Sequence, residues 1–151
     1  MLNLEGVVLR NGEIKMNRND VDTFEKIFGQ LLSIYEELTI LSKKNPIDAV
    51  NKFKLGFVNK LLIESNEFLT KKYLPYEDFE SFNEDDIPQN SDVVFILSQY
   101  LQCFEKLRSD NVINLVGRQW YWEVEGNEDD EDIDDDGMVQ IRTIRPKNLK
   151  E

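Results

Sequence analysis

Residues 19–41 read NDVDTFEKIFGQLLSIYEELTIL, and their apolar side chains recur every three or four positions. This spacing matches the 3.6-residue period of an α-helix and gathers those side chains on one face. Asn19 and Asp20 are residue types that cap helix N-termini, while Lys43 and Lys44 suit the negative end of the helix dipole. The segment therefore predicts a long helix whose buried face is formed by Val21, Phe24, Ile27, Phe28, Leu31, Tyr35 and Leu38.

A second helix is predicted to begin at Asn45-Pro46, because asparagine can cap a helix and proline is tolerated at the first helical position. So short a connection makes the first two helices antiparallel neighbours. Gly29 and Gly56 fall inside them, where each glycine costs about 1 kcal/mol relative to alanine, so we expect close packing at both. The apolar stripe expected on the second helix is Val50, Phe53, Phe57 and Leu61, with Val58 and Phe68 alongside.

A third helix is predicted from Asn90 or Ser91 to about Arg108. It is apolar on two faces, which is typical of a helix at the centre of a core. The two faces are Val94, Leu97, Leu101 and Phe104, and Val93, Ile96, Tyr100 and Leu107.

Strands are predicted near both ends of the chain. Leu4–Leu9 and Glu13–Met16 flank Asn11-Gly12, a dipeptide that accepts the positive φ angles of a type I′ hairpin turn. Arg118–Glu125 and Met138–Ile144 alternate apolar and polar residues, as half-buried strands do. Their alternation assigns Trp120, Trp122 and Val124 to a core face and leaves Tyr121 on the opposite face.

These elements predict an α+β fold and a single domain over residues 1–151: a three-helix bundle, with the third helix central, and one small antiparallel sheet from the N-terminal and C-terminal hairpins. A chain of this length can bury roughly 68–70% of its unfolded surface. With 40% hydrophobic residues it has enough apolar side chains to do so.

The acidic residues are segregated along the chain. Of 30 acidic residues, 17 lie in two stretches without lysine or arginine, Glu77–Asp92 and Glu123–Asp136, so the net charge of −12 belongs to these stretches. We expect them to form acidic loops at about 75–92 and 125–137. Apolar residues within the first loop should anchor it to the core; they are Tyr76, Phe79, Phe82 and Ile87.

A concentrated negative field steers binding of positively charged partners and repels phosphate backbones and anionic membranes. The sequence therefore predicts a non-enzymatic protein that engages a basic protein surface, with no direct contact to nucleic acid or membrane. Its most specific form is an inhibitor or immunity-type protein that occupies the cationic site of a nuclease or other nucleic-acid-binding protein. The candidate partner-binding residues are Glu77, Asp78, Glu80, Glu84, Asp85, Asp86, Tyr121, Glu128, Asp129, Asp130, Glu131, Asp132, Asp134, Asp135 and Asp136.

Two other functions fit the sequence. Asp132, Asp134, Asp136 and Gly137 match the opening of a calcium-binding loop, but the twelfth position is Thr143 instead of a bidentate glutamate. A solvated loop without metal is therefore the favoured interpretation, and a calcium-binding domain is the alternative. The third hypothesis is a structural or assembly subunit of a phage or multiprotein complex, and a homo-oligomer would also fit the segregated charge.

Catalytic groups are scarce. The chain has no histidine, which removes the commonest general base and metal ligand, and no glycine-rich phosphate-binding loop. We predict no catalytic residue and no cofactor. The lone Cys103 reads as a small buried residue in a reducing compartment, and the first residues lack a signal-peptide pattern, so we expect a cytoplasmic protein.

Overall fold

The computed structural model describes residues 7–10, 13–115, 117 and 119–147, and it confirms the α+β class. Within this part of the chain, no helix combines the length and the apolar character that spanning a bilayer requires. The elements, in chain order, are strands β1 (Val7–Arg10) and β2 (Glu13–Met16), helices α1 (Arg18–Lys44) and α2 (Lys52–Phe68), the short 3-10 helix η1 (Glu84–Asp86), helix α3 (Asn90–Asn111), and strands β3 (Val112–Leu115), β4 (Gln119–Glu125) and β5 (Met138–Thr143).

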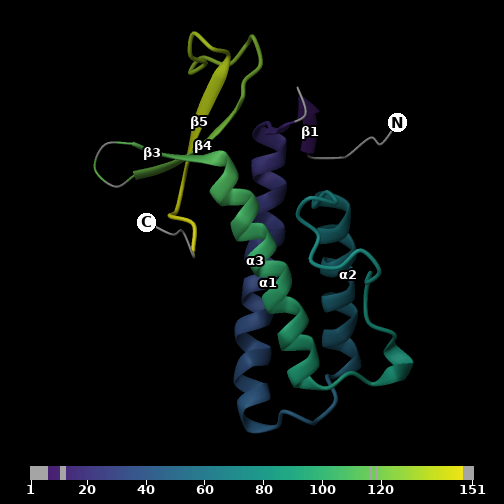
Figure 1. Cartoon of the computed structure of the whole chain (residues 1–151). Coiled ribbons are helices and arrows are strands. Elements are labelled where there is room, and N and C mark those ends of the chain that lie inside the picture. Colours follow the sequence, from purple (N-terminus) through teal and green to yellow (C-terminus); the bar gives the residue numbers. More distant parts are fainter. Residues whose placement is uncertain (1–6, 11–12, 116, 118, 148–151) are drawn as a thin grey trace.

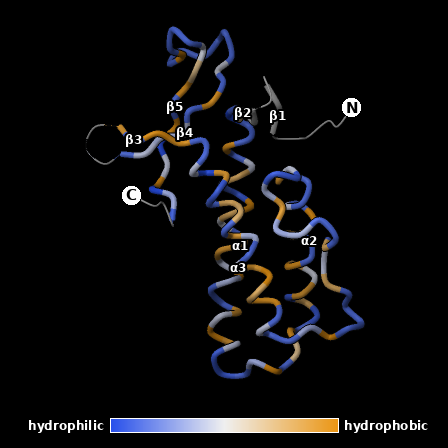
Figure 2. Tube along the Cα trace, viewed as in Figure 1, coloured by the Kyte–Doolittle hydropathy of each residue, from blue (hydrophilic) through white to orange (hydrophobic). Residues whose placement is uncertain are grey.

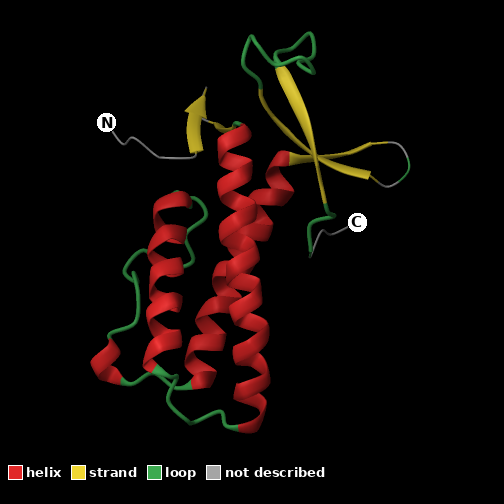
Figure 3. Cartoon of the chain, turned by 180° about the vertical axis from the view of Figure 1, so that it is seen from behind, coloured by secondary structure: helices red, strands yellow, loops and turns green. Residues whose placement is uncertain are grey.

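The three long helices lie side by side, and the β3–β4–β5 sheet sits at one end of them (Figures 1 and 3). Helix α1 packs against both α3 and α2, and β4 packs against α1 and α3. Apolar residues occupy the facing sides of the helices (Figure 2), and α3 has the most buried residues, nine. The extensive helix contacts run through α1, so the structure does not single out α3 as the central helix. The chain from α2 to α3 returns along the outside of α2 and passes through η1 at the end of the bundle remote from the sheet.

Helix α1 begins two residues earlier than the predicted caps. The Asn17 side chain accepts a hydrogen bond from the backbone N–H of Asp20 (2.9 Å), and the Asp20 carboxylate accepts one from the N–H of Asn17 (2.8 Å). This reciprocal capping box makes Asn17 the cap and Asp20 the third helical residue. The predicted buried face is confirmed except at Tyr35, which is half-buried.

The start predicted for the second helix is wrong. Residues 45–51 form a connection, in which the N–H of Val50 donates to Pro88 (2.9 Å), and the N–H of Asn90 donates to Asp48 (2.8 Å). Helix α2 begins only at Lys52, where the side chain of Asn51 accepts hydrogen bonds from the first turn. Pairing with the segment before α3 satisfies backbone groups that a longer helix would otherwise have satisfied.

The predicted buried face of α2 is confirmed at Val58, Leu61 and Phe68 and is wrong at two phenylalanines. Phe53 is 74% exposed and Phe57 is 49% exposed, whereas Leu55, Val58 and Leu62 are buried. Helix α2 therefore carries apolar residues on more than one side, and the stripe that includes Leu55 faces the core. The expectation of close packing at the two helical glycines is also wrong within this chain: a Cβ added to Gly29 or Gly56 would meet nothing within 4 Å.

The strands form two sheets instead of one. Strands β3, β4 and β5 are antiparallel in that order, and β1–β2 is a separate hairpin linked to them by one parallel bridge, Asn17 to Glu125. The predicted C-terminal hairpin is confirmed, and β3, which was not predicted, pairs with β4 as an edge strand. The first part of the predicted N-terminal strand, residues 4–6, and the Asn11-Gly12 turn lie outside the described residues.

An aromatic cluster joins the sheet to the helices. The Phe24 ring lies 4.8 Å from Trp122 and 5.2 Å from Phe104, both edge-to-face, and Phe68 stacks on Phe104 at 6.0 Å between ring centroids. Trp122 and Val124 are fully buried, as alternation along β4 predicted, and Trp120 is half-buried. Aromatic pairs of this kind stabilise a core beyond the area they bury, so the sheet is held firmly on α1 and α3.

Candidate functional site: an acidic loop beside the sheet

The two acidic stretches lie at different places in the fold. Residues 126–137, called the acidic loop below, connect β4 to β5 beyond the sheet, whereas η1 lies at the opposite end of the bundle (Figures 1 and 3). The candidate residues therefore do not form one patch. Glu77, Asp78, Glu80, Glu84, Asp85 and Asp86 belong to the α2–α3 connection, while Tyr121, Glu128, Asp129, Asp130, Glu131, Asp132, Asp134, Asp135 and Asp136 belong to the sheet end.

The first acidic stretch is fixed to α2 by two side-chain amides. Asn59 exchanges two hydrogen bonds with the backbone of Phe82, both 2.9 Å, and Asn66 donates to the carbonyl of Glu80 (2.9 Å). Phe79 and Phe82 contact each other edge-to-face and pack against the core. The expected anchoring is confirmed for these two aromatic residues.

Ile87 is not an anchor, contrary to the prediction. Its side chain is 63% exposed and its φ is +49°, in the left-handed region that a β-branched residue rarely adopts. It ends η1, where its N–H donates to the carbonyl of Glu84 (3.3 Å). The six candidate carboxylates of this stretch are all exposed.

Two carboxylates organise the acidic loop from within. Asp134 accepts hydrogen bonds from the N–H groups of Asp136 (2.9 Å) and Met138 (2.8 Å), and Asp130 accepts one from Asn127 (2.6 Å). These are turn-forming contacts, in which an aspartate bonds the backbone a few residues away. Asp130 and Asp134 therefore hold the loop's shape, a role that the sequence analysis did not assign to them.

Two glycines allow the loop to close. Gly137 has a φ of +78°, which favours glycine, and its carbonyl accepts a hydrogen bond from Gly126 (2.9 Å). At Gly126, an added Cβ would lie 2.6 Å from the Val139 side chain and 3.0 Å from that of Ile133. The base of the loop is thus tightly packed, although most of its carboxylates are exposed.

Arg18 at the start of α1 ties the loop to the helices. Its Nε lies 3.2 Å from Asp130 and its Nη2 lies 2.7 Å from Asp132. The hydrogen bond to Asp132 is the main cause that raises the pKa of Arg18. The Arg18 and Asp132 side chains are 40% and 58% exposed, so their pairing adds little stability, but together with the more buried Asp130 it holds the loop against the start of α1.

The same contacts argue against the calcium-loop geometry. One oxygen of Asp134 is occupied by two backbone N–H groups, and one oxygen of Asp132 is occupied by Arg18. Across the described residues, no three acidic or thiol side chains lie close enough together to hold one metal ion. The carboxylates at alternate positions of the motif therefore do not converge on a common point.

A hollow of about 290 Å³ lies between the acidic loop and the sheet. The strand register places Tyr121, Met138, Gln140 and Leu115 on the sheet face opposite to the buried Trp122. Tyr121 is half-buried, and it lines the hollow together with Leu115, Met138, Gln140, Asp132 and Asp134. An aromatic ring beneath carboxylates is suited to a lysine or arginine side chain, through cation–π contact and charge-assisted hydrogen bonds.

The remaining loop carboxylates have no partner within the described part of the chain. They are exposed, and they project from a loop whose own shape does not depend on them. They are Glu128, Asp129, Glu131, Asp135 and Asp136.

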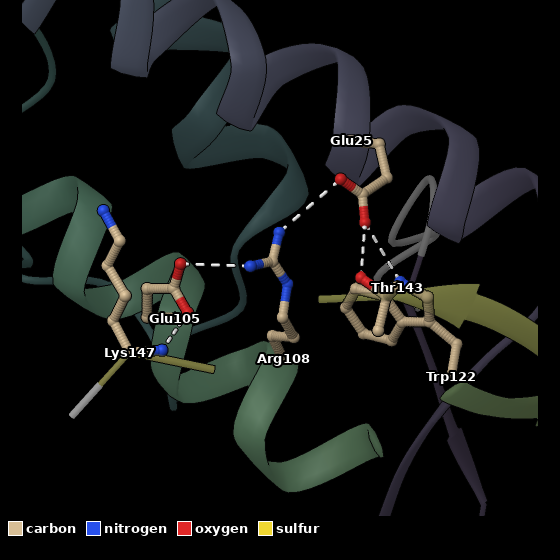
Figure 4. Close-up of polar contacts among 6 residues, drawn as sticks. All are labelled: Glu25, Glu105, Arg108, Trp122, Thr143 and Lys147. Carbon is tan, nitrogen blue, oxygen red and sulfur yellow. Dashed lines mark hydrogen bonds and ion pairs between the residues drawn. The ribbon is translucent and has the colours of Figure 1, made fainter. Parts of the chain in front are cut away.

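A buried charged cluster was missed by the sequence analysis (Figure 4). The Arg108 side chain is fully buried; its Nη1 bonds Glu105 (3.1 Å) and its Nη2 lies 3.5 Å from Glu25. Glu25 also accepts hydrogen bonds from the indole N–H of Trp122 and the hydroxyl of Thr143, both 3.1 Å. The i, i+3 spacing of Glu105 and Arg108 was the only signal in the sequence, and many exposed pairs share it.

This cluster joins α1, α3 and both strands of the C-terminal hairpin. The guanidinium lies over the rings of Phe24 (5.1 Å) and Phe28 (4.7 Å), and its Nε makes no hydrogen bond in the structure. Because Arg108 has no exposed surface, a ligand cannot reach it. The cluster therefore has a structural role: it holds the sheet, and with it the acidic loop, against the helices.

Burial disfavours the ionised forms of Cys103 and Tyr100. Burial raises the pKa of the Cys103 thiol, which disfavours the reactive thiolate. Burial also raises the pKa of Tyr100 to about 12, and its hydroxyl donates to Asn66 (2.6 Å). These groups contribute to packing and to hydrogen bonding between helices.

Comparison with models of protein families, with curated proteins and with solved structures found no match for the chain. A functional proposal for it must therefore be built from the chemistry of its own residues. The acidic loop combines a high density of one charge with an adjoining hollow of mixed polar and apolar lining.

Proposed function

We propose that this chain is a non-enzymatic binding protein whose acidic loop and adjoining sheet face engage a basic protein surface. The observation that carries the proposal is the hollow lined by Tyr121, Asp132 and Asp134, next to a loop that carries five further exposed carboxylates. A cationic side chain of the partner would enter this hollow, and the surrounding carboxylates would attract the partner from a distance. A reducing compartment such as the cytoplasm suits the lone, half-buried Cys103.

The fixed shape of the loop supports this proposal. Its turns are held by Asp130, Asp134 and Arg18, so the loop need not lose much conformational freedom when it binds. The α2–α3 connection is also acidic and anchored, but the 290 Å³ hollow is lined only by residues of the sheet and the acidic loop. We therefore assign partner binding to the sheet end and not to η1.

The more specific form of the proposal is an inhibitor or immunity-type protein. Carboxylates spaced along a fixed loop can take the place of the phosphates that a nuclease or nucleic-acid-binding protein holds with lysine and arginine. Such a complex should associate fast at low salt, and the rate should fall steeply as salt rises, because exposed charges are screened within about 8–10 Å at physiological ionic strength.

The experiment measures association with a panel of purified nucleases and nucleic-acid-binding domains of high isoelectric point, at low and physiological salt. The variant D129N/E131Q/D135N/D136N removes four charges that do not shape the loop. We expect it to slow association by about tenfold or more while the melting temperature stays unchanged.

The matched control is E84Q/D85N/D86N/D92N, which removes the same charge from η1 and the first turn of α3. It should slow association by less than about threefold, because these two elements lie at the end of the bundle remote from the sheet (Figure 1). Equal effects of the two variants would show that net charge alone matters and would refute the assignment to the loop. If no protein of the panel binds in a salt-dependent manner, that result contradicts the proposal of an inhibitor or immunity-type protein.

A further inference from the structure

Helix α2 exposes apolar residues on the side turned away from the core. Phe53 is 74% exposed and Ile63 is 45% exposed. Gly56 and Lys60 lie between them at spacings of three, four and three residues, so all four occupy one face of the helix. Large exposed apolar side chains that share a face mark a contact surface more often than chance placement does.

Gly56 gives this face a second unusual property. Glycine in the middle of a helix costs stability relative to alanine, and an added Cβ at Gly56 would meet nothing within 4 Å. Packing within this chain therefore does not explain the glycine. A missing side chain on an exposed helix face does allow another backbone to approach closely.

The charges on α2 run against its own dipole. Lys52 stands in the first turn, Glu64 and Glu67 stand near the C-terminal end, and the helix has no acidic residue in its first turn and no basic residue in its last. Negative charge is normally favoured at the N-terminus and positive charge at the C-terminus. Lys52 and Glu64 make no ion pair within the residues that the structure describes, whereas Lys54 is paired with Glu37 (2.8 Å).

We propose that this face of α2 binds the same face of a second copy of the chain, with the two helices antiparallel around a two-fold axis. A two-fold contact at the level of Val58 places Phe53 opposite Ile63 of the second copy and Gly56 opposite Lys60. The same register places Lys52 opposite Glu64, and each pair occurs twice because the interface is self-complementary.

This arrangement accounts for all three features of the face. The exposed Phe53 and Ile63 bury each other, and the aliphatic stem of Lys60 lies across the space left at Gly56. Antiparallel pairing brings the positive first turn of one helix beside the negative end of the other, which offsets the unfavourable dipole interactions of both. In an antiparallel pair, the positive end of each α2 helix meets the negative end of the other. This favours a second copy of the chain over an unrelated protein as the binding partner.

The test is sedimentation velocity of the full chain over 1–100 μM at about 150 mM salt, which screens repulsion between two acidic copies. We expect a monomer–dimer equilibrium that Phe53→Ser weakens at least tenfold. Gly56→Ala should weaken it similarly. The matched control Gly29→Ala, also an exposed helical glycine, should leave dimerisation unchanged.

A charge exchange tests the register. Lys52→Glu should weaken the dimer, and the double variant K52E/E64K should restore it, because both symmetric pairs are then reversed together. A circular-dichroism melt confirms that each variant is folded, which is expected because the altered residues are not buried. A monomer at 100 μM overturns the proposal, and so does a dimer that is insensitive to Phe53→Ser or is not restored by K52E/E64K. Binding of a basic partner by the acidic loop is measured separately, so either proposal can fail alone.

Discussion

Removing the charge of Glu105 should destabilise the fold more than any surface substitution. The Arg108 side chain is fully buried, and Glu105, whose side chain is 6% exposed, is the nearest carboxylate at 3.1 Å. The other carboxylate, Glu25, lies 3.5 Å away and its side chain is 43% exposed. Glu105→Gln therefore leaves a buried cation with one distant, solvated counter-charge. We expect the free energy of unfolding to fall by about 3–5 kcal/mol.

The double variant E105L/R108M should be far less harmful than the single change. Arg108 already has Nε and Nη2 without hydrogen bonds, and each unsatisfied buried group costs about 1–3 kcal/mol. Replacing the pair with apolar side chains removes this cost, and a methionine thioether can occupy the space beside the Phe24 and Phe28 rings. The double variant should therefore lie within about 1–2 kcal/mol of the parent chain.

Urea unfolding followed by circular dichroism and by tryptophan fluorescence measures both changes, since Trp122 donates to Glu25 within the same cluster. The control is Lys106→Met, which breaks an exposed ion pair with Asp110 and should cost less than about 1 kcal/mol. The reasoning is refuted if Glu105→Gln costs no more than this control. It is also refuted if the double variant loses as much stability as the two single variants together.

Three further predictions concern single residues. Gly29→Ala should raise the free energy of unfolding by about 0.5–1 kcal/mol in urea titrations, because alanine favours the helix and its Cβ meets nothing; a loss would contradict this. Gly126→Ala should lower it by about 1–3 kcal/mol, because the new Cβ would lie 2.6 Å from Val139, and an unchanged melting temperature would show that the loop base is loose. Burial raises the pKa of Asp20 from 3.8 to about 6. The folded chain then binds a proton that the unfolded chain releases, so stability should fall by about 2 kcal/mol as pH rises from 4 to 7. Asp20→Asn keeps an acceptor for the N–H of Asn17 and should flatten that part of the stability profile; an unaltered profile in urea titrations at several pH values would refute the assignment.

The elements with one unambiguous apolar face were predictable from the sequence. Helix α1 and the β4–β5 hairpin follow the predicted periodicities along most of their length. The start of α1 was missed because Asn17, Asn19 and Asp20 are all good capping residues. Only the structure shows that Asp20 bonds back to Asn17, which selects the first of them.

The buried face of α2 was predicted correctly at Val58, Leu61 and Phe68 but wrongly at Phe53 and Phe57, because the helix carries apolar residues around most of its circumference. Periodicity alone gives two acceptable stripes, one through Phe53 and Phe57 and one through Leu55, Val58 and Leu62. The choice between them depends on tertiary packing against α1 and α3. Strand β3 was missed for a related reason, since it follows α3 directly and has only four residues to show a pattern.

The sequence predicted which segments of the candidate site carry negative charge, but not how those segments are arranged in space. Segregation of acidic residues identified both exposed stretches, yet linear order cannot show that the first runs along α2 to η1, at the end of the bundle remote from the sheet, whereas the second projects beyond the sheet. Nor can it distinguish Asp134, which bonds the backbone of its own loop, from Asp135, which does not. That distinction depends on turn geometry, and it decides which carboxylates can be neutralised without disturbing the loop.

The positions of the two proposed binding surfaces in the fold allow each surface to be tested without the other. The C-terminal end of α2 lies toward the same end of the bundle as the sheet (Figure 1). An antiparallel pair of α2 helices therefore carries its two acidic loops at opposite ends of the dimer. Two partners can then bind without touching each other, so a dimer-deficient Gly56→Ala chain should bind each basic partner with unchanged affinity. A large loss of affinity in that variant would mean that the second copy contributes to the binding surface, which antiparallel pairing does not allow.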